Sequence, residues 1–585
     1  MGDPGPSGEI IRFADFELDL GGSELRKQGV KIKLQEQPFQ ILQILSQSPG
    51  RVVTREELQQ KIWASDTFVD FDHGLYNAIK RLREALADDA ERPQYIETVP
   101  RRGYRFIGKI VPKAFASPNR FESLLVLPLE NLSRDPEQEY FADGLTEAII
   151  SELAKISGLR VLSRMTAMFY KNVRRPLPDI AHERGVDAVI EGSVVRSGER
   201  VRVSIQLIDG RTDAHVWAEA YDRDLREVLV LYSELARAVA SQVSRRADRQ
   251  QMADKTSLPG REMVPRRVDP VAYEAYLKGR YHWNKRTPAG VKRGAEYFQQ
   301  AIAKDPTYAA AYAGLADSAG LAGFWAFVHP QDGCGKAKFA ARRAIDIEET
   351  AEAHASMGWA ILHHDFDFLA AEKEFRRAIE LNSGYATAHQ WYGHCLGYMG
   401  RSEASITQTT QALQLDPLSP IIHASCAGAY GFAGQFDRAI EICHAGLELD
   451  PRFAPLRWVL AHFLQAKGMF DEAINERQKA VDLSPGVPVF IGELGGAYAA
   501  AGERKKALAV LHELMEFSKE RYVMAYWIAL IHAGLKERHE AFDWLEKAYQ
   551  ERSAHLALLK VDPRLEFLHS DHRFQDLLRR MNFPQ

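Results

Sequence analysis

The chain has 585 residues, of which 46% are hydrophobic and 26% charged, and its formal net charge is −4. Three to four domains are expected, because one hydrophobic core does not support a chain of this length, and a net charge this small predicts no partner by itself. The four cysteines, Cys334, Cys395, Cys426 and Cys443, lack the spacing of disulfides or metal ligands, which is typical of a reducing cytoplasm. The sequence shows no signal peptide and no run of about 18 apolar residues. We therefore expect a cytoplasmic protein without a membrane span.

The first predicted domain covers residues 8–112 and begins with strands. Apolar and polar residues alternate around Gly21-Gly22, which predicts two or three short strands. Apolar residues at helical spacing follow and end at Pro49-Gly50, so a first helix is expected there. Thr54 and Glu57 have the spacing of a capping box, in which each residue caps the other, and they predict the start of a second helix.

A third helix, Asp72 to Ala87, and a hairpin after it are the most informative part of this domain. Four apolar residues share one side of the helix: Leu75, Ile79, Leu82 and Leu86. The opposite side carries His73, Asn77, Lys80, Arg81 and Glu84. Asn, Lys and Arg side chains can hydrogen-bond base edges and phosphates in a major groove, although a solvated surface helix has the same pattern. The hairpin has a basic turn at Arg101-Arg102-Gly103, which offers a second contact with DNA.

The order of these elements and the string ETVPRRGYRF resemble the OmpR/PhoB-type winged-helix domain, in the version found in CadC- and ToxR-like regulators but without their membrane span. The resemblance implies that Asp72 to Ala87 is the recognition helix and Tyr95 to Phe106 the wing. It implies DNA contacts from Asn77, Lys80, Arg81 and Arg83 on the helix and from Arg101, Arg102 and Arg105 on or beside the wing. His73 lies on the same polar side of the helix and is expected to contact DNA as well. A helical-wheel projection places Arg83 away from the centre of the polar side, which favours contact with phosphate over contact with bases. In the family, the loop corresponding to Ala64 to Phe71 often meets RNA polymerase.

The charge of this domain is balanced. Residues 9–112 contain sixteen Lys and Arg and sixteen Asp and Glu. A non-specific DNA binder would be strongly basic, so we expect modest affinity for a monomer. Paired half-sites occupied by a homodimer, or help from another domain, would then supply the strength of binding.

After a linker at 113–121, residues 122–245 predict an α/β module with a mixed sheet. The apolar run LLVLPL suits a buried strand, and three later strands alternate around turns at Ser197-Gly198 and Asp209-Gly210. Asp143-Gly144 is expected to start a helix rather than to form a catalytic or metal site. The segments FADGLTEAII, VDAVIEGSV and HVWAEAYDR resemble the TolB N-terminal-like module of bacterial signalling proteins, which implies a non-catalytic role.

A second linker, 246–269, precedes a region with a period of 34 residues. Small residues recur at this step at Ala371, Ser405, Ala439, Ala473, Ala507 and Ala541. Glycines recur at Gly400, Gly434, Gly468 and Gly502. This is the period of tetratricopeptide repeats, which we place at 270–550, with a helical cap at 551–585. Nine extra residues are expected near 329–335. The aromatic residues of the repeats are expected to be core more often than groove lining.

The predicted fold class is therefore multidomain, α+β and then all-α: a winged helix-turn-helix, a mixed α/β module and an α-solenoid of tetratricopeptide repeats. The predicted function is that of a sequence-specific transcriptional regulator in signal transduction. Its winged helix binds double-stranded DNA, and its repeat groove receives a protein or peptide. The alternative is an interaction scaffold whose winged helix binds protein. No catalytic, cofactor or metal site is predicted, and the chain is not expected to be an enzyme.

Overall fold

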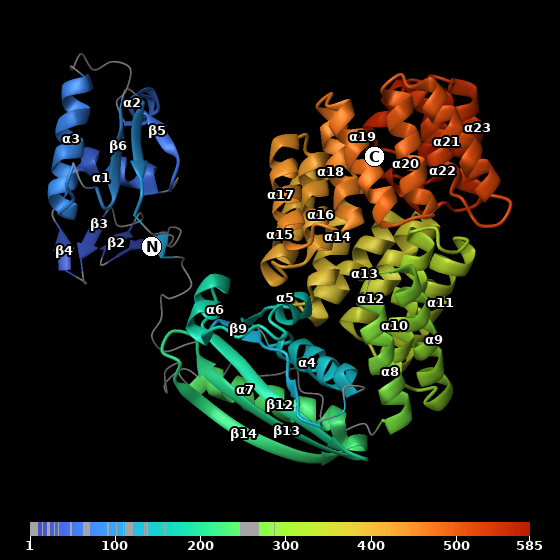
Figure 1. Cartoon of the computed structure of the whole chain (residues 1–585), viewed down its shortest axis with the longest axis horizontal. Helices are drawn as coiled ribbons and strands as arrows, with labels where there is room; N and C mark the ends of the chain where they lie inside the picture. The colour runs from blue at the N-terminus through green and yellow to red at the C-terminus, as the bar shows by residue number, and fades with distance from the viewer. Residues whose placement is uncertain are drawn as a thin grey trace, which may run out of the picture. The chain divides into compact units, whose positions relative to one another are not determined.

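The computed structural model describes residues 10–584 except 15, 20–23, 28–29, 33, 47–48, 63–70, 91–92, 101, 109, 112–120, 134, 136–137, 157, 246–267 and 286. The chain divides into two compact units, Met1–Asn119 and Arg120–Gln585, which are described separately (Figure 1). Among the described residues no helix is long and apolar enough to cross a membrane.

The first unit begins with four antiparallel strands: β1 (Ile10–Phe13), β2 (Phe16–Asp19), β3 (Glu24–Lys27) and β4 (Val30–Ile32). The strand β8 (Ile110–Val111) pairs with β1 and completes this sheet. The sequence predicts two or three strands here, whereas the structure has four. Each strand is only three or four residues long, so the same stretch of sequence accommodates one more strand than expected. The predicted turn Gly21-Gly22 lies outside the described residues.

Three helices and a second sheet follow. The helices are α1 (Glu36–Ser46), α2 (Arg55–Ile62) and α3 (Phe71–Leu86). The sheet has the order β5-β7-β6, with β5 (Val52–Thr54), β6 (Ile96–Val99) and β7 (Gly103–Phe106). The capping box is confirmed: the Thr54 amide donates to Glu57 Oε2 at 3.1 Å, and the Glu57 amide donates to Thr54 Oγ1 at 3.1 Å. This reciprocal bonding starts α2 directly after β5.

The second unit begins with a six-stranded mixed sheet. Five of its strands lie in the order β11-β9-β12-β13-β14, and β10 (Glu130–Asn131) pairs with β12. The bounds are β9 (Ser123–Val126), β11 (Arg160–Val161), β12 (Ala188–Ser197), β13 (Arg200–Asp209) and β14 (His215–Asp224). The strand β9 runs parallel to β11 and β12, whereas β12, β13 and β14 are antiparallel. The helices of this module are α4 (Glu139–Leu153), α5 (Arg164–Phe169), α6 (Leu177–Arg184) and α7 (Val228–Arg245).

One local prediction in this module is wrong. Asp143-Gly144 does not start a helix but lies inside α4. Asp143 is buried and accepts a 2.5 Å hydrogen bond from Lys171 Nζ. A Cβ on Gly144 would lie 2.5 Å from Leu277 Cδ2, so the glycine allows α4 to pack closely on α8 (Pro270–Trp283). The Asp209-Gly210 turn is confirmed, because Asp209 Oδ1 accepts from the Arg211 and Thr212 amides.

The repeat array comprises the sixteen helices α8 to α23 of the described residues, packed as eight antiparallel pairs. After α8 they are α9 (Pro288–Lys304), α10 (Ala309–Phe324), α11 (Lys336–Ile347), α12 (Ala351–Ala360), α13 (Phe368–Leu381), α14 (Ala386–Tyr398), α15 (Ser402–Leu415), α16 (Pro420–Phe432), α17 (Phe436–Leu449), α18 (Ala454–Ala466), α19 (Phe470–Leu483), α20 (Pro488–Ala500), α21 (Arg504–Phe517), α22 (Ala525–Gly534) and α23 (Arg538–Gln550).

The period of 34 residues corresponds to these pairs. The small residues of the period are all buried: Ala371, Ser405, Ala439, Ala473, Ala507 and Ala541. The glycines between paired helices have φ between 72° and 84°, a conformation that favours glycine: Gly400, Gly434, Gly468 and Gly502. The extra residues precede α11, where a π-helix spans Gln331–Gly335. Trp359 and Trp391 are each 3% exposed, so they belong to the core as expected.

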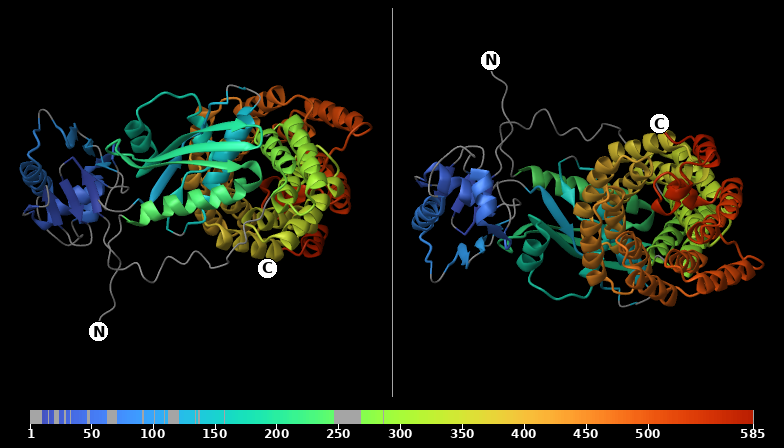
Figure 2. Two further views of the ribbon diagram at one scale, coloured as in Figure 1. Left: turned by 90° about the horizontal axis from the view of Figure 1, so that it is seen from below. Right: turned by 90° about the horizontal axis from the view of Figure 1, so that it is seen from above.

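Residues 551–584, which we call the closing segment, extend further than a cap on the last repeat. The segment contains the short helices η6 (Ala554–Leu558) and η7 (Pro563–Leu568) and the helix α24 (His572–Arg580). The His555 ring lies 4.4 Å from that of Phe324 on α10, and the Phe583 ring 4.4 Å from that of Phe368 on α13. The array therefore curves until its last residues meet its first repeats (Figure 2).

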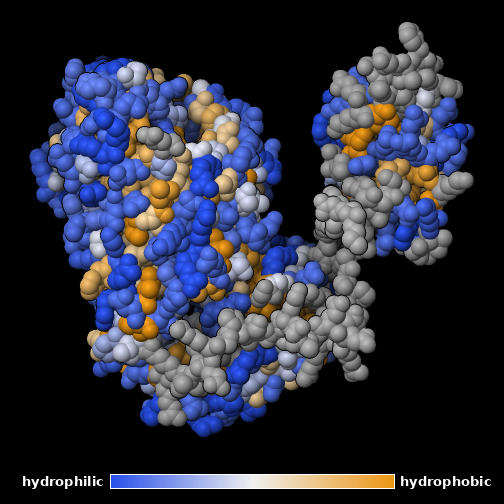
Figure 3. All heavy atoms as spheres, turned by 180° about the vertical axis from the view of Figure 1, so that it is seen from behind, coloured by the Kyte–Doolittle hydropathy of each residue, from blue (hydrophilic) through white to orange (hydrophobic). Residues whose placement is uncertain are grey.

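The surface of the second unit is largely polar. On the face that Figure 3 shows, hydrophilic residues predominate and apolar residues form smaller areas between them. Among the large apolar side chains of the described repeat helices, the most exposed are Phe339 on α11, Leu369 on α13 and Val271 on α8. Most apolar side chains of the repeats therefore lie between helices, as expected where each pair packs against its neighbours.

The α/β module and the array share a buried boundary. Asp416, in the turn between α15 and α16, accepts from the Thr166 amide at 3.0 Å and from Thr166 Oγ1 at 2.8 Å. Glu147 of α4 forms an ion pair with Arg280 of α8. The turn of one repeat therefore caps the short helix α5 of the module, and the second unit holds together as one body.

Candidate nucleic-acid interface

The helix α3 has the two sides that the sequence predicts. Its apolar side is buried against the core of the first unit: Leu75, Ile79, Leu82 and Leu86 are each at most 2% exposed. On the other side Lys80, Arg81 and Glu84 are exposed, and Asn77 is half-buried. His73 lies within α3, but its side chain is outside the described residues. The polar side is therefore accessible to a ligand at least from Asn77 to Glu84.

Two of the predicted contact residues are held by partners within the wing. Arg83 Nη2 donates to the Ile96 carbonyl oxygen at 2.9 Å and to Thr98 Oγ1 at 2.8 Å, so it ties α3 to the wing strand β6. Arg105 Nη1 lies 3.2 Å from Glu97 Oε2, between residues directly opposite each other in β6 and β7. Both guanidinium groups thus stabilise the wing, and their contact with DNA stays a prediction.

The tip of the wing exposes Arg102, whose amide donates to the Val99 carbonyl oxygen at 3.1 Å. Arg101 lies outside the described residues. Gly103 allows β7 to approach β5, because a Cβ there would lie 2.0 Å from the Val53 carbonyl oxygen. The predicted loop Ala64 to Phe71 is outside the described residues up to Asp70, and Phe71 begins α3.

Sequence reasoning missed three residues of this surface. Tyr76 on α3 is 64% exposed and lies one turn before Lys80, so its ring is part of the polar side. Gln35 Oε1 accepts a hydrogen bond from Arg81 Nη1, which fixes the direction of that guanidinium. Asp88 accepts from the amides of Gln94, Tyr95 and Ile96, which anchors the start of the wing to the end of α3. The helical wheel could have identified Tyr76, but the other two contacts depend on the tertiary fold.

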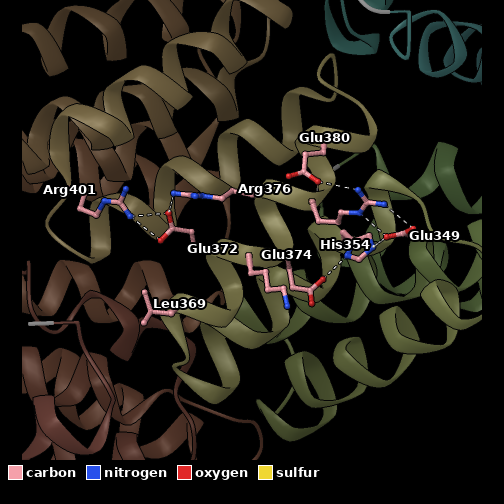
Figure 4. Close-up of a pocket in the computed structure, with 10 residues that line it drawn as sticks. Glu349, His354, Leu369, Glu372, Glu374, Arg376, Glu380 and Arg401 are labelled. Atoms are coloured by element: carbon pink, nitrogen blue, oxygen red, sulfur yellow. Dashed lines mark hydrogen bonds and ion pairs between the residues drawn. The ribbon is translucent and has the colours of Figure 1, made fainter. Parts of the chain in front are cut away.

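A charged surface pocket of about 670 Å³ lies on α12, α13 and their neighbours in the second unit (Figure 4). Its charges neutralise one another. Arg376 and Arg401 both donate to Glu372, and His354 lies between Glu349 and Glu374. The hydrogen bond from Arg377 lowers the pKa of Glu349 to about 2. Such a self-paired surface leaves little net charge to select a ligand, and no cluster of metal-ligating side chains occurs among the described residues.

Comparisons with known proteins agree with the winged-helix geometry. Residues 29–106 match the family described as "Transcriptional regulatory protein, C terminal". Residues 121–237 match the family described as "HilA/YgeH-like transcriptional regulator, second domain". The second match gives the α/β module a relative among regulators, and its resemblance to the TolB N-terminal-like module stays a prediction.

Three relatives match different shares of the chain. A protein of Rhizobium meliloti (strain 1021), provisionally named adenylate cyclase 3, is 31% identical over 276 residues, which are 46% of this chain and 43% of that protein. The transcriptional regulator HilA of Salmonella typhi is 23% identical over 411 residues, 69% of this chain and 70% of HilA. The cholera toxin transcriptional activator of Vibrio cholerae is 38% identical over 79 residues, 14% of this chain and 27% of that protein.

The chain thus spans less than half the length of the Rhizobium protein, and two of these three relatives are named as regulators of transcription. The chain joins a winged-helix domain that matches the transcriptional regulatory C-terminal family, an α/β module that matches the HilA/YgeH-like second domain, and an array with the architecture of tetratricopeptide repeats.

Proposed function

We propose that this chain regulates transcription by binding specific DNA sequences through its first unit. The observation that carries the proposal is the helix α3, which buries its apolar side and exposes Lys80 and Arg81 beside a basic wing, within a segment that matches a regulatory DNA-binding family. In this proposal α3 enters a major groove, whose width admits a helix and whose base edges are distinguishable by hydrogen bonding.

Each predicted residue then has a role. Asn77, Lys80 and Arg81 contact base edges and nearby phosphates. His73, near the start of α3, contacts the DNA backbone. Arg101 and Arg102 at the wing tip contact phosphates or an adjacent minor groove. Arg83 and Arg105, which are held by partners in the wing, also contact the flanking phosphates. The Ala64 to Phe71 loop meets RNA polymerase.

Binding by a pair of chains follows from the balanced charge of the domain. Sixteen basic and sixteen acidic residues between 9 and 112 provide no general attraction to DNA. Two chains on two half-sites multiply the contributions of few contacts. The proposed domains are 8–112, 122–245, 270–550 and 551–585, joined by linkers at 113–121 and 246–269, and the chain acts in the cytoplasm, where its DNA target lies.

The repeat array is the proposed input, which receives a protein or peptide. The closing segment lies on its inner surface, where His555 contacts Phe324, Trp458 and Trp527. A partner therefore binds the outer surface or displaces this segment. The match to regulator families supports a regulator without catalytic activity, whereas the relative named as a cyclase shares only part of its length with this chain.

The test has two steps. The full chain first selects its binding site from genomic DNA fragments, and the affinity of the chain for the selected site is then measured by titration. The double variant Lys80→Ala/Arg81→Ala should weaken binding at least about 10-fold and lower the salt dependence by about one unit for each phosphate contact that the substitutions remove. Lys31→Ala is the matched control, because Lys31 is an exposed basic residue of the same unit on the strand β4. Equal weakening in the control and in the double variant, or unchanged binding by the double variant, would refute the role of α3.

The second candidate is an interaction scaffold in which the first unit binds protein. The internal pairing of Arg83 and Arg105 and the balanced charge favour it over a non-specific nucleic-acid binder. Absence of DNA binding at low salt by the folded full chain, with partner capture abolished by Lys80→Ala, would support the scaffold.

A further inference from the structure

The strand β14 forms one edge of the six-stranded sheet. It pairs with β13 from Arg200↔Asp224 to Ile208↔His215, which is its whole length. In the part of the chain that the structure describes, no strand pairs with its other side, and Figure 1 shows it at the margin of the sheet. Ten residues of edge strand present a row of backbone donors and acceptors to any strand that can approach.

Two features that often prevent pairing between molecules, lysine and proline, are missing from this edge. Exposed edge strands in monomeric proteins are commonly short, or carry lysine, proline or a bulge. The sequence HVWAEAYDRD contains neither lysine nor proline, and its charged residues are of both signs: Glu219, Asp222, Arg223 and Asp224. The register shift of this hairpin lies at Leu207/Ile208, near one end. Four consecutive positions from Ala218 to Tyr221 include three exposed residues, two of which are alanines. The middle of β14 therefore presents two small side chains to a second strand, Ala218 and Ala220, beside the larger Glu219 and Tyr221.

The two sides of β14 are distinct. Tyr221 is buried, and Arg223 Nη2 lies 2.9 Å from Glu234 Oε2 on α7, so the odd-numbered residues face the helix layer. Successive side chains alternate along a strand, which places Ala218, Ala220 and Asp222 on the open side of the sheet. All three of these residues are exposed.

We propose that β14 pairs antiparallel with β14 of a second copy of this chain, so that the two sheets become one continuous sheet. A two-fold axis perpendicular to the sheet keeps helix-facing residues opposite helix-facing residues. One residue must therefore lie opposite its own copy, and its identity fixes the register.

Charge selects this register. With Tyr221 at the centre, Glu219 lies opposite Arg223 of the second copy, and the same contact occurs twice in the dimer. With Glu219 at the centre, two glutamates would face each other, which is destabilising because opposite side chains are only about 5 Å apart at Cβ. A register centred on Ala220 pairs neither charge. Glu219 already accepts a 2.8 Å hydrogen bond from the Tyr221 hydroxyl, which holds its carboxylate beside the edge.

In the paired dimer each chain carries a first unit on its own linker. When one first unit occupies a half-site, the pairing raises the local concentration of the other first unit beside it. This consequence rests on the proposed function, whereas the pairing itself does not depend on DNA. The dimer interface lies in the second unit, so it supplies the paired binding that the balanced first unit requires.

Two charge reversals test the proposal on the full chain. Glu219→Arg places arginine opposite arginine, and Arg223→Glu places glutamate opposite glutamate, so each variant should raise the dimer dissociation constant at least about 10-fold. In a mixture of the two, the introduced arginine of one chain faces the introduced glutamate of the other. The native Arg223 of the first chain likewise faces the native Glu219 of the second, so a mixed dimer should form. Formation of that mixed dimer also proves that both variants fold.

Sedimentation equilibrium with differently labelled chains measures these species, and Glu130→Arg, an exposed reversal on the strand β10 of the same sheet, is the matched control. A wild-type chain that stays monomeric at about 100 µM would overturn the proposal, since such a Kd is too weak for pairing in solution. Dimerisation unaffected by both reversals, or no mixed dimer from two variants that are each monomeric, would overturn it as well. Binding of Glu219→Arg to a single half-site should be unchanged, so absence of DNA binding in the wild type counts against the proposed function alone.

Discussion

His363 and His555 are at most 1% exposed inside the repeat array, and burial lowers the pKa of each to about 3 from its ordinary value of 6.5. His394 faces His363, while Glu493, Arg564 and His462 lie within electrostatic reach of His555. Both imidazoles are therefore neutral in the folded chain at pH 5, whereas in the unfolded chain they bind protons below about pH 6.5. Because the unfolded state binds more protons, stability falls as the pH decreases from 6.5 towards 3.

At pH 5 each histidine lies about 1.5 pH units below its unfolded pKa, and each unit corresponds to about 1.4 kcal/mol. The stability contributed by each group therefore falls by about 2 kcal/mol between pH 7 and pH 5, and the pair accounts for about 4 kcal/mol as an upper value. Buried carboxylates such as Glu493, whose pKa is lowered by Arg564 and His462 against the opposing effect of burial, stay ionised over this interval.

The assay is denaturant unfolding of the full chain at pH 7 and pH 5, followed by tryptophan fluorescence, since Trp458 and Trp527 contact the His555 ring. His555→Phe removes one proton-binding group and keeps a ring of similar shape, so its pH-dependent decrease in stability should be smaller by about 2 kcal/mol. Neither nitrogen of His555 has a hydrogen-bond partner among the described residues, so the variant should fold. His572→Phe is the control, because that side chain is 92% exposed. If His555→Phe keeps the full pH dependence of the wild type, the reasoning is refuted.

Four further substitutions test individual contacts. Thr54→Ala removes half of the capping box and should cost the first unit about 1 kcal/mol in calorimetry; an unchanged transition would show that the box contributes nothing. Gly103→Ala brings a Cβ against the Val53 carbonyl oxygen and should cost about 2 kcal/mol or more, with weaker DNA binding, whereas Arg102→Ala should weaken DNA binding at unchanged stability. Asp416→Ala leaves the buried Thr166 amide unpaired and should lower the unfolding free energy of the second unit by about 1–3 kcal/mol. Wild-type stability of this variant would show that the hydrogen bond between Thr166 and Asp416 does not stabilise the contact between the module and the repeats.

The parts of the fold that the sequence predicts are those with local or periodic causes. The capping box of Thr54 and Glu57 depends on residues three apart, and the apolar side of α3 depends on helical spacing. The repeat array follows from the period of 34 residues, because a small residue and a glycine are needed at the same step in each pair.

The features that the sequence misses or misplaces depend on distant partners. Asp143-Gly144 resembles the start of a helix in the sequence. The reason for the glycine is its contact with Leu277, which belongs to another predicted domain, so the local sequence does not reveal it. The family resemblance assigns Arg83 to DNA, and its hydrogen bonds to the wing form only when α3 and β6 are folded together. The reach of the closing segment to Phe324 and Phe368 has no periodic pattern at all, so residue spacing could not predict it.

The closing segment has a consequence for the order in which the chain can mature. In an open solenoid each repeat contacts only its neighbours, so repeats can fold one after another as the ribosome releases them. Here Phe324 and Phe368, in early repeats, complete their packing with His555 and Phe583, which are translated more than 200 residues later. The early repeats therefore wait, with aromatic surface exposed, until the closing segment has been made. Completion of the array is thus coupled to synthesis of this segment, and a chain that stops short of it carries an unfinished interior that chaperones and proteases can recognise.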